Sequence, residues 1–264
     1  MDSSLHRLSK NRRGRIFLIS SLSEKIYSYS KLAELIFFPS FCELCSSLLE
    51  FPQERVICHA CWKSIRASYP SYCLCCGRFF EALEEPHHCQ VCLEKRPPFS
   101  HHRSCGKYKG KLKDIILLYK YRHFQVLGKD LANFAYRALG QEEEIWWKVD
   151  AIIPVPLHPK RKKKRGFNQA QVIAKELARI KGIELRDQML LKIKNVPPQT
   201  SLRVEERAEN VSGAFGVAEG DKIKRKVVLL VDDVYTTGST IRECSSVLRK
   251  AGVKEVKALT VAQA

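Results

Sequence analysis

The residues with the clearest capacity for chemistry form one short string near the C-terminal end of the chain. Residues 227–240 read VVLLVDDVYTTGST, in which an apolar run is followed by two carboxylates, several hydroxyl side chains around one glycine, and the start of a helical pattern. The N–H groups and partial positive charge of a helix N-terminus attract an anion, and a glycine lets that anion approach closely. The string therefore predicts a phosphate-binding loop.

Two carboxylates beside the loop indicate which kind of phosphate compound would fit. Asp232 and Asp233 lie one step from the loop, where they would accept hydrogen bonds from ribose hydroxyls. The residues expected to contact the phosphate are Thr236, Thr237, Gly238, Ser239 and Thr240. A Walker loop or a dinucleotide fingerprint would need glycine and lysine spacings that the sequence does not contain. An ordinary strand-to-helix turn capped by Ser239 is the alternative interpretation.

Eight cysteines form four Cys-x-x-Cys pairs, and the last two pairs repeat the first two at an offset of 31 residues. This spacing indicates an internal duplication. Two such pairs supply the four thiolates of a tetrahedral zinc site, so the sequence predicts two structural Zn²⁺ ions in a double zinc ribbon. The expected ligand sets are Cys42, Cys45, Cys58 and Cys61, and Cys73, Cys76, Cys89 and Cys92.

The spacing leaves other arrangements of the cysteines open. The two halves could exchange ligands, and Cys75 could replace Cys76, although the repeat favours Cys76. Disulfides would need an oxidising compartment, and redox-active pairs rarely occur fourfold at equal spacing. Cys105 and Cys244 are expected to be core or surface residues. A zinc ribbon alone does not indicate nucleic-acid binding, because many ribbons only dock one domain on another.

The elements that must position the loop follow from apolar periodicity. Apolar runs at 151–155, 227–231 and 256–261 predict strands, and apolar spacing at 169–180 and 239–251 predicts helices. Asn168 is the expected cap of the first helix, and Gly252 the expected end of the second. This alternation predicts an α/β fold with a parallel sheet and crossover helices. A basic loop is expected between the strand at 151–155 and Asn168.

Composition limits the classes of protein to consider. The chain has 46 Lys and Arg residues against 28 Asp and Glu residues, and its net charge of +18 favours anionic partners. No apolar run approaches the roughly 18 residues of a membrane span, so a membrane protein is excluded. The N-terminal segment lacks the apolar core of a signal peptide. These patterns predict a reducing, cytoplasmic location.

The string DDVYTTGST resembles the phosphoribosyl pyrophosphate (PRPP) signature of type I phosphoribosyltransferases. The wider chain, from about residue 38 to its end, resembles the ComF family of competence proteins. The strings that carry this resemblance are CELC through CQVC, LYKY within 108–121, PVPLHPKRKKKRGFNQA at 154–170 and QTSLRVEERAENVSGAF at 199–215. The resemblance implies a poorly defined basic segment over 1–37, a double zinc ribbon over 38–98 and a phosphoribosyltransferase-like domain over 99–264.

The resemblance also implies roles for residues outside the phosphate loop. The turn at Val155 and Pro156 would hold the pyrophosphate of PRPP, with Mg²⁺ bridging its oxygens. The neighbouring run KRKKKR at 160–165 suits that charge, and Arg165 can bind it in a bidentate manner. Arg203 and Arg207 would belong to the loop that closes over the substrate in such enzymes, although a solvated helix face explains them equally well.

Two functions remain in view from the sequence. The first is a PRPP-binding protein of DNA uptake or processing, with other competence or DNA-processing proteins as partners. If it catalyses transfer, Asp232 and Asp233 would be the catalytic pair, and an oxocarbenium-like ribose would be attacked by a nitrogen nucleophile. Thr236 stands where purine-specific members carry an Asp base, so the acceptor is not indicated. The second is a single-stranded DNA-binding zinc protein in which the transferase fold is a non-catalytic scaffold.

Overall fold

The computed structural model describes residues 39–51, 54–67, 69–82, 84–193 and 213–264. By its internal contacts the chain forms two units, Met1–Trp62 and Lys63–Ala264. All four predicted ligands of the first cysteine repeat lie in the smaller unit, as does the start of α2 (His59–Lys63). The second repeat lies in the larger unit together with the α/β fold. The boundary predicted at residue 98 therefore runs within the larger unit.

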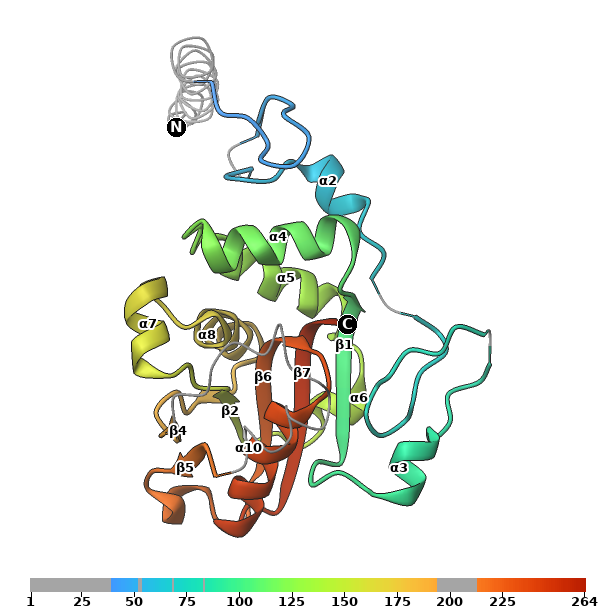
Figure 1. Cartoon of the computed structure of the whole chain (residues 1–264), viewed down its shortest axis with the longest axis vertical. Coiled ribbons are helices and arrows are strands. Elements are labelled where there is room, and N and C mark those ends of the chain that lie inside the picture. The colour runs from blue at the N-terminus through green and yellow to red at the C-terminus, as the bar shows by residue number, and fades with distance from the viewer. Residues whose placement is uncertain (1–38, 52–53, 68, 83, 194–212) are drawn as a thin grey trace, which may run out of the picture. The chain divides into compact units, whose positions relative to one another are not determined.

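The larger unit is built on a five-stranded sheet in which every pair of neighbouring strands is parallel (Figure 1). Their spatial order is β1 (His101–Lys107), β7 (Glu255–Gln263), β6 (Val227–Tyr235), β2 (Ala151–Pro154) and β3 (Glu184–Leu185). The central strands β2, β6 and β7 are almost continuously buried, as expected for a parallel sheet with helices on both faces. The predicted α/β class is confirmed.

Helices cover both faces of this sheet. On one face, α5 (Leu127–Leu139) packs against α8 (Gln169–Lys181), and α4 (Gly110–Tyr121) packs on α5. On the other face lie α10 (Ser239–Lys250) and an antiparallel pair, β4 (Leu190–Lys192) with β5 (Phe215–Val217). The other described elements are α3 (Gln90–Glu94), α6 (Glu143–Trp146), α7 (Pro159–Arg165) and the 3₁₀ helix η2 (Gly220–Ile223).

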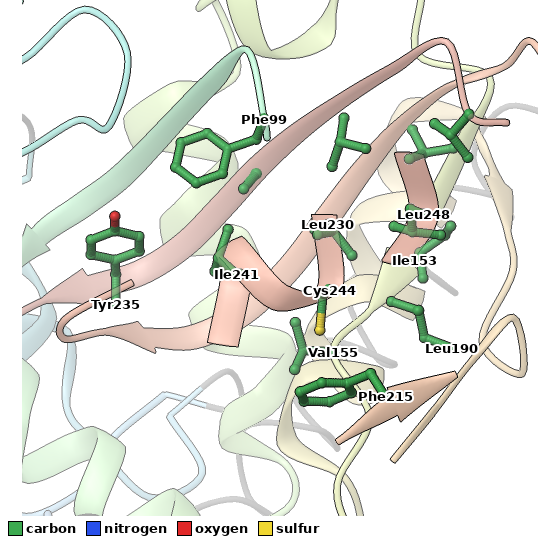
Figure 2. Close-up of a cluster of buried hydrophobic side chains, with 14 of the residues drawn as sticks. Phe99, Ile153, Val155, Leu190, Phe215, Leu230, Tyr235, Ile241, Cys244 and Leu248 are labelled. Atoms are coloured by element: carbon green, nitrogen blue, oxygen red, sulfur yellow. The ribbon is translucent and has the colours of Figure 1, made fainter. Parts of the chain in front are cut away.

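The buried core between α10 and the sheet fixes which way the carboxylates of β6 point. Figure 2 shows Leu230 among the α10 side chains Ile241, Cys244 and Leu248. Successive strand residues face opposite sides of a sheet. Asp232 therefore shares the α10 face with Leu230, whereas Asp233 points to the face covered by α4, α5 and α8.

The helix caps confirm the prediction for Asn168 and contradict the prediction of a basic loop. The Asn168 side chain accepts a hydrogen bond from the Ala170 backbone at 3.2 Å, so the predicted cap of α8 is confirmed. The basic run is not a loop but the helix α7. Pro159 occupies its first turn, the His158 side chain caps it, and Gly166 ends it in the left-handed conformation.

The strand that precedes the phosphate loop is longer than predicted. β6 continues past Val231 to Tyr235 because β7 pairs with it as far as Gln263. Both carboxylates therefore lie inside the strand and not beyond it. β1 and the β4–β5 pair are elements that the apolar periodicity did not predict. Among the described helices, none combines the length and apolar character needed to cross a membrane.

Candidate functional site

The carboxyl ends of β2 and β6 lie side by side at one edge of the sheet. Pro154 pairs with Val231, and the Val155 backbone donates a hydrogen bond to the Val231 carbonyl at 2.9 Å. The turn at Val155 and Pro156 is therefore next to the start of the carboxylate pair. In open α/β sheets, ligands bind at this edge, outside the carboxyl ends of the strands.

The structure adds a lysine to the carboxylate pair. The Lys120 ammonium, near the end of α4, lies 2.7 Å from Asp233 Oδ1, and the two side chains are only 15% and 12% exposed. Asp232 instead accepts a hydrogen bond from the Asp233 backbone N–H at 2.8 Å. Sequence reasoning did not single out Lys120. Its one signal was the LYKY string, which contains it.

Burial and neighbouring charges set the electrostatic character of Asp232 and Lys120. Burial, together with the neighbouring charge of Asp233, raises the pKa of Asp232 to about 7. Burial opposes the charge of Lys120, but attraction to Asp233 outweighs this and raises the pKa of Lys120. The Lys120 ammonium is thus charged at neutral pH, whereas Asp232, with a pKa of about 7, is close to half protonated there.

The phosphate loop depends on glycine at its centre. Gly238 has a φ of 77°, and a Cβ atom there would lie 2.2 Å from the Tyr235 hydroxyl and 2.4 Å from Cζ. The Tyr235 ring therefore packs directly on the glycine backbone. Only a residue without a side chain fits this turn and leaves its N–H groups open to a ligand.

The start of α10 suits an anion. Ser239 is its first helical residue and Gly238 its N-cap, which makes no side-chain cap hydrogen bond. The Ser239 N–H donates only a long hydrogen bond, 3.5 Å, to Thr237 Oγ1. The interpretation of Ser239 as an ordinary cap is therefore wrong. Thr237 Oγ1 and Ser239 Oγ are 3.1 Å apart, and Thr240 follows in the first turn, while Thr236 is exposed. These hydroxyls surround N–H groups that have no partner within the helix.

The residues predicted for pyrophosphate are only partly brought together. The Val155 carbonyl accepts a hydrogen bond from Asn168 Nδ2 at 3.0 Å, which ties the turn to the start of α8. Arg165, at the end of α7, donates to Gln169 Oε1 at 3.1 Å, and its guanidinium lies over the Tyr121 ring. Arg203 and Arg207 lie outside the described residues.

The eight predicted ligand cysteines form two tetrads in the uncrossed arrangement. In each tetrad, Cys42, Cys45, Cys58 and Cys61 or Cys73, Cys76, Cys89 and Cys92, all sulfurs lie within 4.8 Å of one another. The separations of Cys42–Cys61, Cys45–Cys58 and Cys76–Cys89 are 3.9, 3.6 and 3.7 Å. Bonds of about 2.3 Å to a tetrahedral metal require sulfur separations of about 3.8 Å. Each tetrad could hold a metal ion.

Backbone geometry shows the duplication as well. Cys58 N–H approaches Cys42 Sγ at 3.4 Å, and Cys89 N–H approaches Cys73 Sγ at 3.3 Å, again 31 positions apart. Such N–H···S contacts orient metal-binding thiolates. Cys75 is buried beside the second tetrad without belonging to it, so the alternative with Cys75 as ligand is not favoured.

Cys105 and Cys244 are fully buried, and Cys244 packs with Ile241 and Leu248 as expected.

Comparison with known proteins places this geometry in a family. A family model described as the phosphoribosyl transferase domain matches residues 125–264, more than half of the chain. Competence protein F of Haemophilus influenzae is 33% identical over 180 residues, which cover 67% of this chain and 79% of the relative. The chain belongs to the ComF family, within the phosphoribosyl transferase domain family.

Other ComF relatives agree. Competence protein ComFC of Streptococcus pneumoniae is 32% identical over 173 residues, or 66% of this chain and 72% of that protein. DNA utilization protein YhgH of Escherichia coli K12 is 26% identical over 176 residues, or 64% and 74% of the two chains. The predicted ComF resemblance is confirmed. The matched residues 125–264 begin after Lys120, so the phosphoribosyl transferase family match does not cover this lysine.

Proposed function

We propose that this ComF protein binds PRPP, or a related ribose phosphate, and serves DNA uptake or processing. The observation that carries the ligand is the start of α10 at Gly238, an N-cap without a side-chain hydrogen bond, on the turn that follows the carboxylate strand β6. The names of the relatives, which are competence and DNA utilization proteins, support the biological role.

Different residues of the site bind different parts of the ligand. The 5′-phosphate lies on the loop from Thr236 to Thr240, and the ribose hydroxyls donate to Asp232 and Asp233. Lys120 holds Asp233 in place. The pyrophosphate lies at the Val155–Pro156 turn with Arg165 near it, and Mg²⁺ bound with PRPP supplies further neutralising charge. Arg203 and Arg207, which lie outside the described residues, are proposed to bind the substrate as well.

Transfer of the ribose phosphate to a nitrogen nucleophile is the reaction class that such a site supports. The chain contributes positioning, through the loop and the carboxylates, and charge stabilisation, through Lys120 and Arg165. Thr236 is exposed and, as a threonine, offers no general base at its position in the loop.

The metal of both cysteine tetrads is proposed to be Zn²⁺. Four thiolates in a tetrahedron suit zinc, and the separations of the sulfurs match its bond length. Thiolates that bind metal must stay reduced, which supports a cytoplasmic location. Both ions are structural, because four protein ligands leave no open coordination position.

A second candidate function, single-stranded DNA binding, has its own support. The lysines of α7 are exposed, and beside them lies a cavity of about 850 Å³ next to α8. Its lining includes the basic residues Lys129, Lys162, Lys175 and Arg179 and the acidic residues Asp187 and Glu176, of which Glu176 pairs with Arg179. A basic groove of this kind would follow a phosphate backbone. It lies beside the PRPP site and not in it, so both ligands can be bound by one protein.

Calorimetry of Mg²⁺-PRPP binding to the zinc-loaded chain tests the first function. We expect binding by the wild type and none by a folded Asp232→Ala/Asp233→Ala variant. Single-stranded DNA binding should persist in that variant and fall steeply with salt. Absence of PRPP binding by the wild type would refute the transferase-type site and leave the DNA-binding function.

A further inference from the structure

The second cysteine cluster is fastened to the sheet by three consecutive residues of one turn. The His102 backbone N–H donates to the Cys75 carbonyl at 2.8 Å, and His102 Nδ1 donates to the Cys76 carbonyl at 2.7 Å. Gly77 follows, and a Cβ atom there would lie 2.3 Å from the His102 carbonyl oxygen. Cys76 is a ligand of the second tetrad, so the tetrad and the fully buried His102 are joined by one hydrogen bond.

His102 in turn supports the residue on which the phosphate loop rests. Its ring stacks on the Tyr235 ring, with centroids 4.0 Å apart and planes inclined by 21°. Its Nε2 lies 3.0 Å from Thr260 Oγ1, which fixes the ring from the other side. Tyr235 is buried at one end of the α10 core, beyond Ile241 (Figure 2), and its hydroxyl end packs on Gly238.

A continuous series of contacts therefore runs from the second tetrad to the phosphate loop. It consists of the Cys76 carbonyl, the His102 ring, the Tyr235 ring and the Gly238 backbone. Every member is buried, so none can shift without displacing its neighbour. The first tetrad makes none of these contacts.

We infer that metal binding at the second cysteine tetrad positions the phosphate loop through His102 and Tyr235, and that anion binding at the loop strengthens metal retention in return. This inference rests on the proposed phosphate ligand and zinc. The reciprocity is required because coupling between two binding sites has the same magnitude in both directions. His102 and Tyr235 are positioning residues.

The first test compares variants at corresponding cysteines of the two repeats, and the first repeat is the control for the second. Cys76→Ser and Cys45→Ser remove corresponding ligands from the second and first tetrads of the full chain. Mg²⁺-PRPP affinity is measured by calorimetry, and hydrogen exchange of residues 236–241 is measured without ligand. We expect Cys76→Ser to weaken PRPP binding at least about fivefold and to accelerate exchange of the loop. Cys45→Ser should change neither.

The two readouts separate failure of the inference from failure of the proposed ligand. Unchanged loop exchange in Cys76→Ser, or equal acceleration in Cys45→Ser, would overturn the inference. If the wild type does not bind PRPP, the proposed ligand is wrong, and the exchange comparison still decides whether the tetrad orders the loop.

A second test needs no cysteine variant, in case Cys76→Ser fails to fold. Zinc release from the wild type to a chelator is followed with and without Mg²⁺-PRPP. We expect PRPP to slow release of one of the two ions severalfold. Tyr235→Phe, which keeps the ring, should preserve this effect, and Tyr235→Leu should abolish it. Slowing of both ions or of neither, or slowing that persists in Tyr235→Leu, would overturn the inference.

Discussion

Lys120 divides the work of two adjacent carboxylates. It pairs with Asp233, while burial raises the pKa of Asp232, on the opposite face of β6, to about 7. Two neighbouring carboxylates in different environments can have different tasks. In the proposed site, Asp233 is the carboxylate that Lys120 holds in place, and Asp232 is the group whose protonation a ligand can change.

Removal of Lys120 tests the first of these tasks. Lys120→Met leaves Asp233 buried without its partner, and we expect a loss of roughly 3 kcal/mol in the free energy of unfolding. PRPP affinity should fall more than about tenfold, because Asp233 then lacks the partner that holds it in place. Urea denaturation and calorimetry give the two values. Lys113→Met, at an exposed position of the same helix, is the matched control and should change neither.

The second task gives a pH-dependent prediction. The folded protein holds the Asp232 proton more tightly than the unfolded chain, in which a carboxyl titrates near 4. The stabilisation from this proton is present below about pH 4 and is lost as pH rises through 7. Asp232→Asn has no carboxyl group to ionise and therefore does not lose this stabilisation as pH rises. At pH 8 we expect the variant to be more stable than the wild type by on the order of 2 to 4 kcal/mol.

Urea denaturation at pH 5 and pH 8 checks this sign. The advantage of Asp232→Asn should be smaller at pH 5, where wild-type Asp232 is still protonated in the folded state. An advantage of equal size at both values would show that the carboxyl does not titrate in this range.

At the scale of elements, the sequence predicted what local patterns encode. Asn168 and Gly252 mark helix ends, and the apolar runs of β2, β6 and β7 mark buried strands. β1 reads HHRSCGK and has no apolar pattern. Its polar residues His102, Arg103 and Ser104 are nevertheless buried, and they make hydrogen bonds to the cysteine cluster, Thr260 and Glu144.

Long-range contacts explain the remaining differences. β4 and β5 pair only because they meet across the α10 face, and Lys120 reaches Asp233 from a distant helix. Neither pairing leaves a local signal. The loop and both tetrads were predictable because their function requires particular residue types at fixed, short spacings.

The turn between β6 and α10 gives a prediction that a single methyl group can test. Gly238→Ala forces a Cβ against Tyr235 at a positive φ, so we expect PRPP affinity to fall more than about tenfold with a loss of about 1 to 2 kcal/mol in stability. Gly216→Ala in β5 is the matched control, because the nearest atom to its new Cβ is 3.9 Å away. Equal PRPP binding by both variants would count against the loop.

The exposed charges of α7 test the DNA-binding function. Each phosphate contact on a single strand contributes about 0.7 to the slope of log affinity against log salt. Replacing Lys162, Lys163 and Lys164 with Gln should lower that slope by up to about 2. Replacing Lys222, Lys224 and Arg225 removes the same charge elsewhere and should change it little. Fluorescence anisotropy over a salt series distinguishes DNA binding by α7 from an effect of net charge alone.

At the scale of the whole molecule, one duplicated motif serves two different units. The first tetrad belongs to the smaller unit and leaves Cys45 exposed, whereas all four sulfurs of the second are buried in the larger unit. Elemental analysis should find about two zinc ions per chain. Cys45→Ser and Cys76→Ser should each remove one, and only loss at the second tetrad should lower the melting temperature of the α/β fold. Iron in place of zinc would refute the metal assignment.

The hydrogen bond between the second cysteine cluster and β1 also protects the protein from self-association. β1 is the terminal strand of the sheet, and the cysteine turn occupies its outer side through the bond from His102 to the Cys75 carbonyl. A terminal strand with free N–H and C=O groups is a template for pairing with another chain. Removal of zinc from the second tetrad would expose this strand edge, so we expect the zinc-free protein to self-associate. Light scattering should rise when a chelator is added and fall again when zinc is restored promptly.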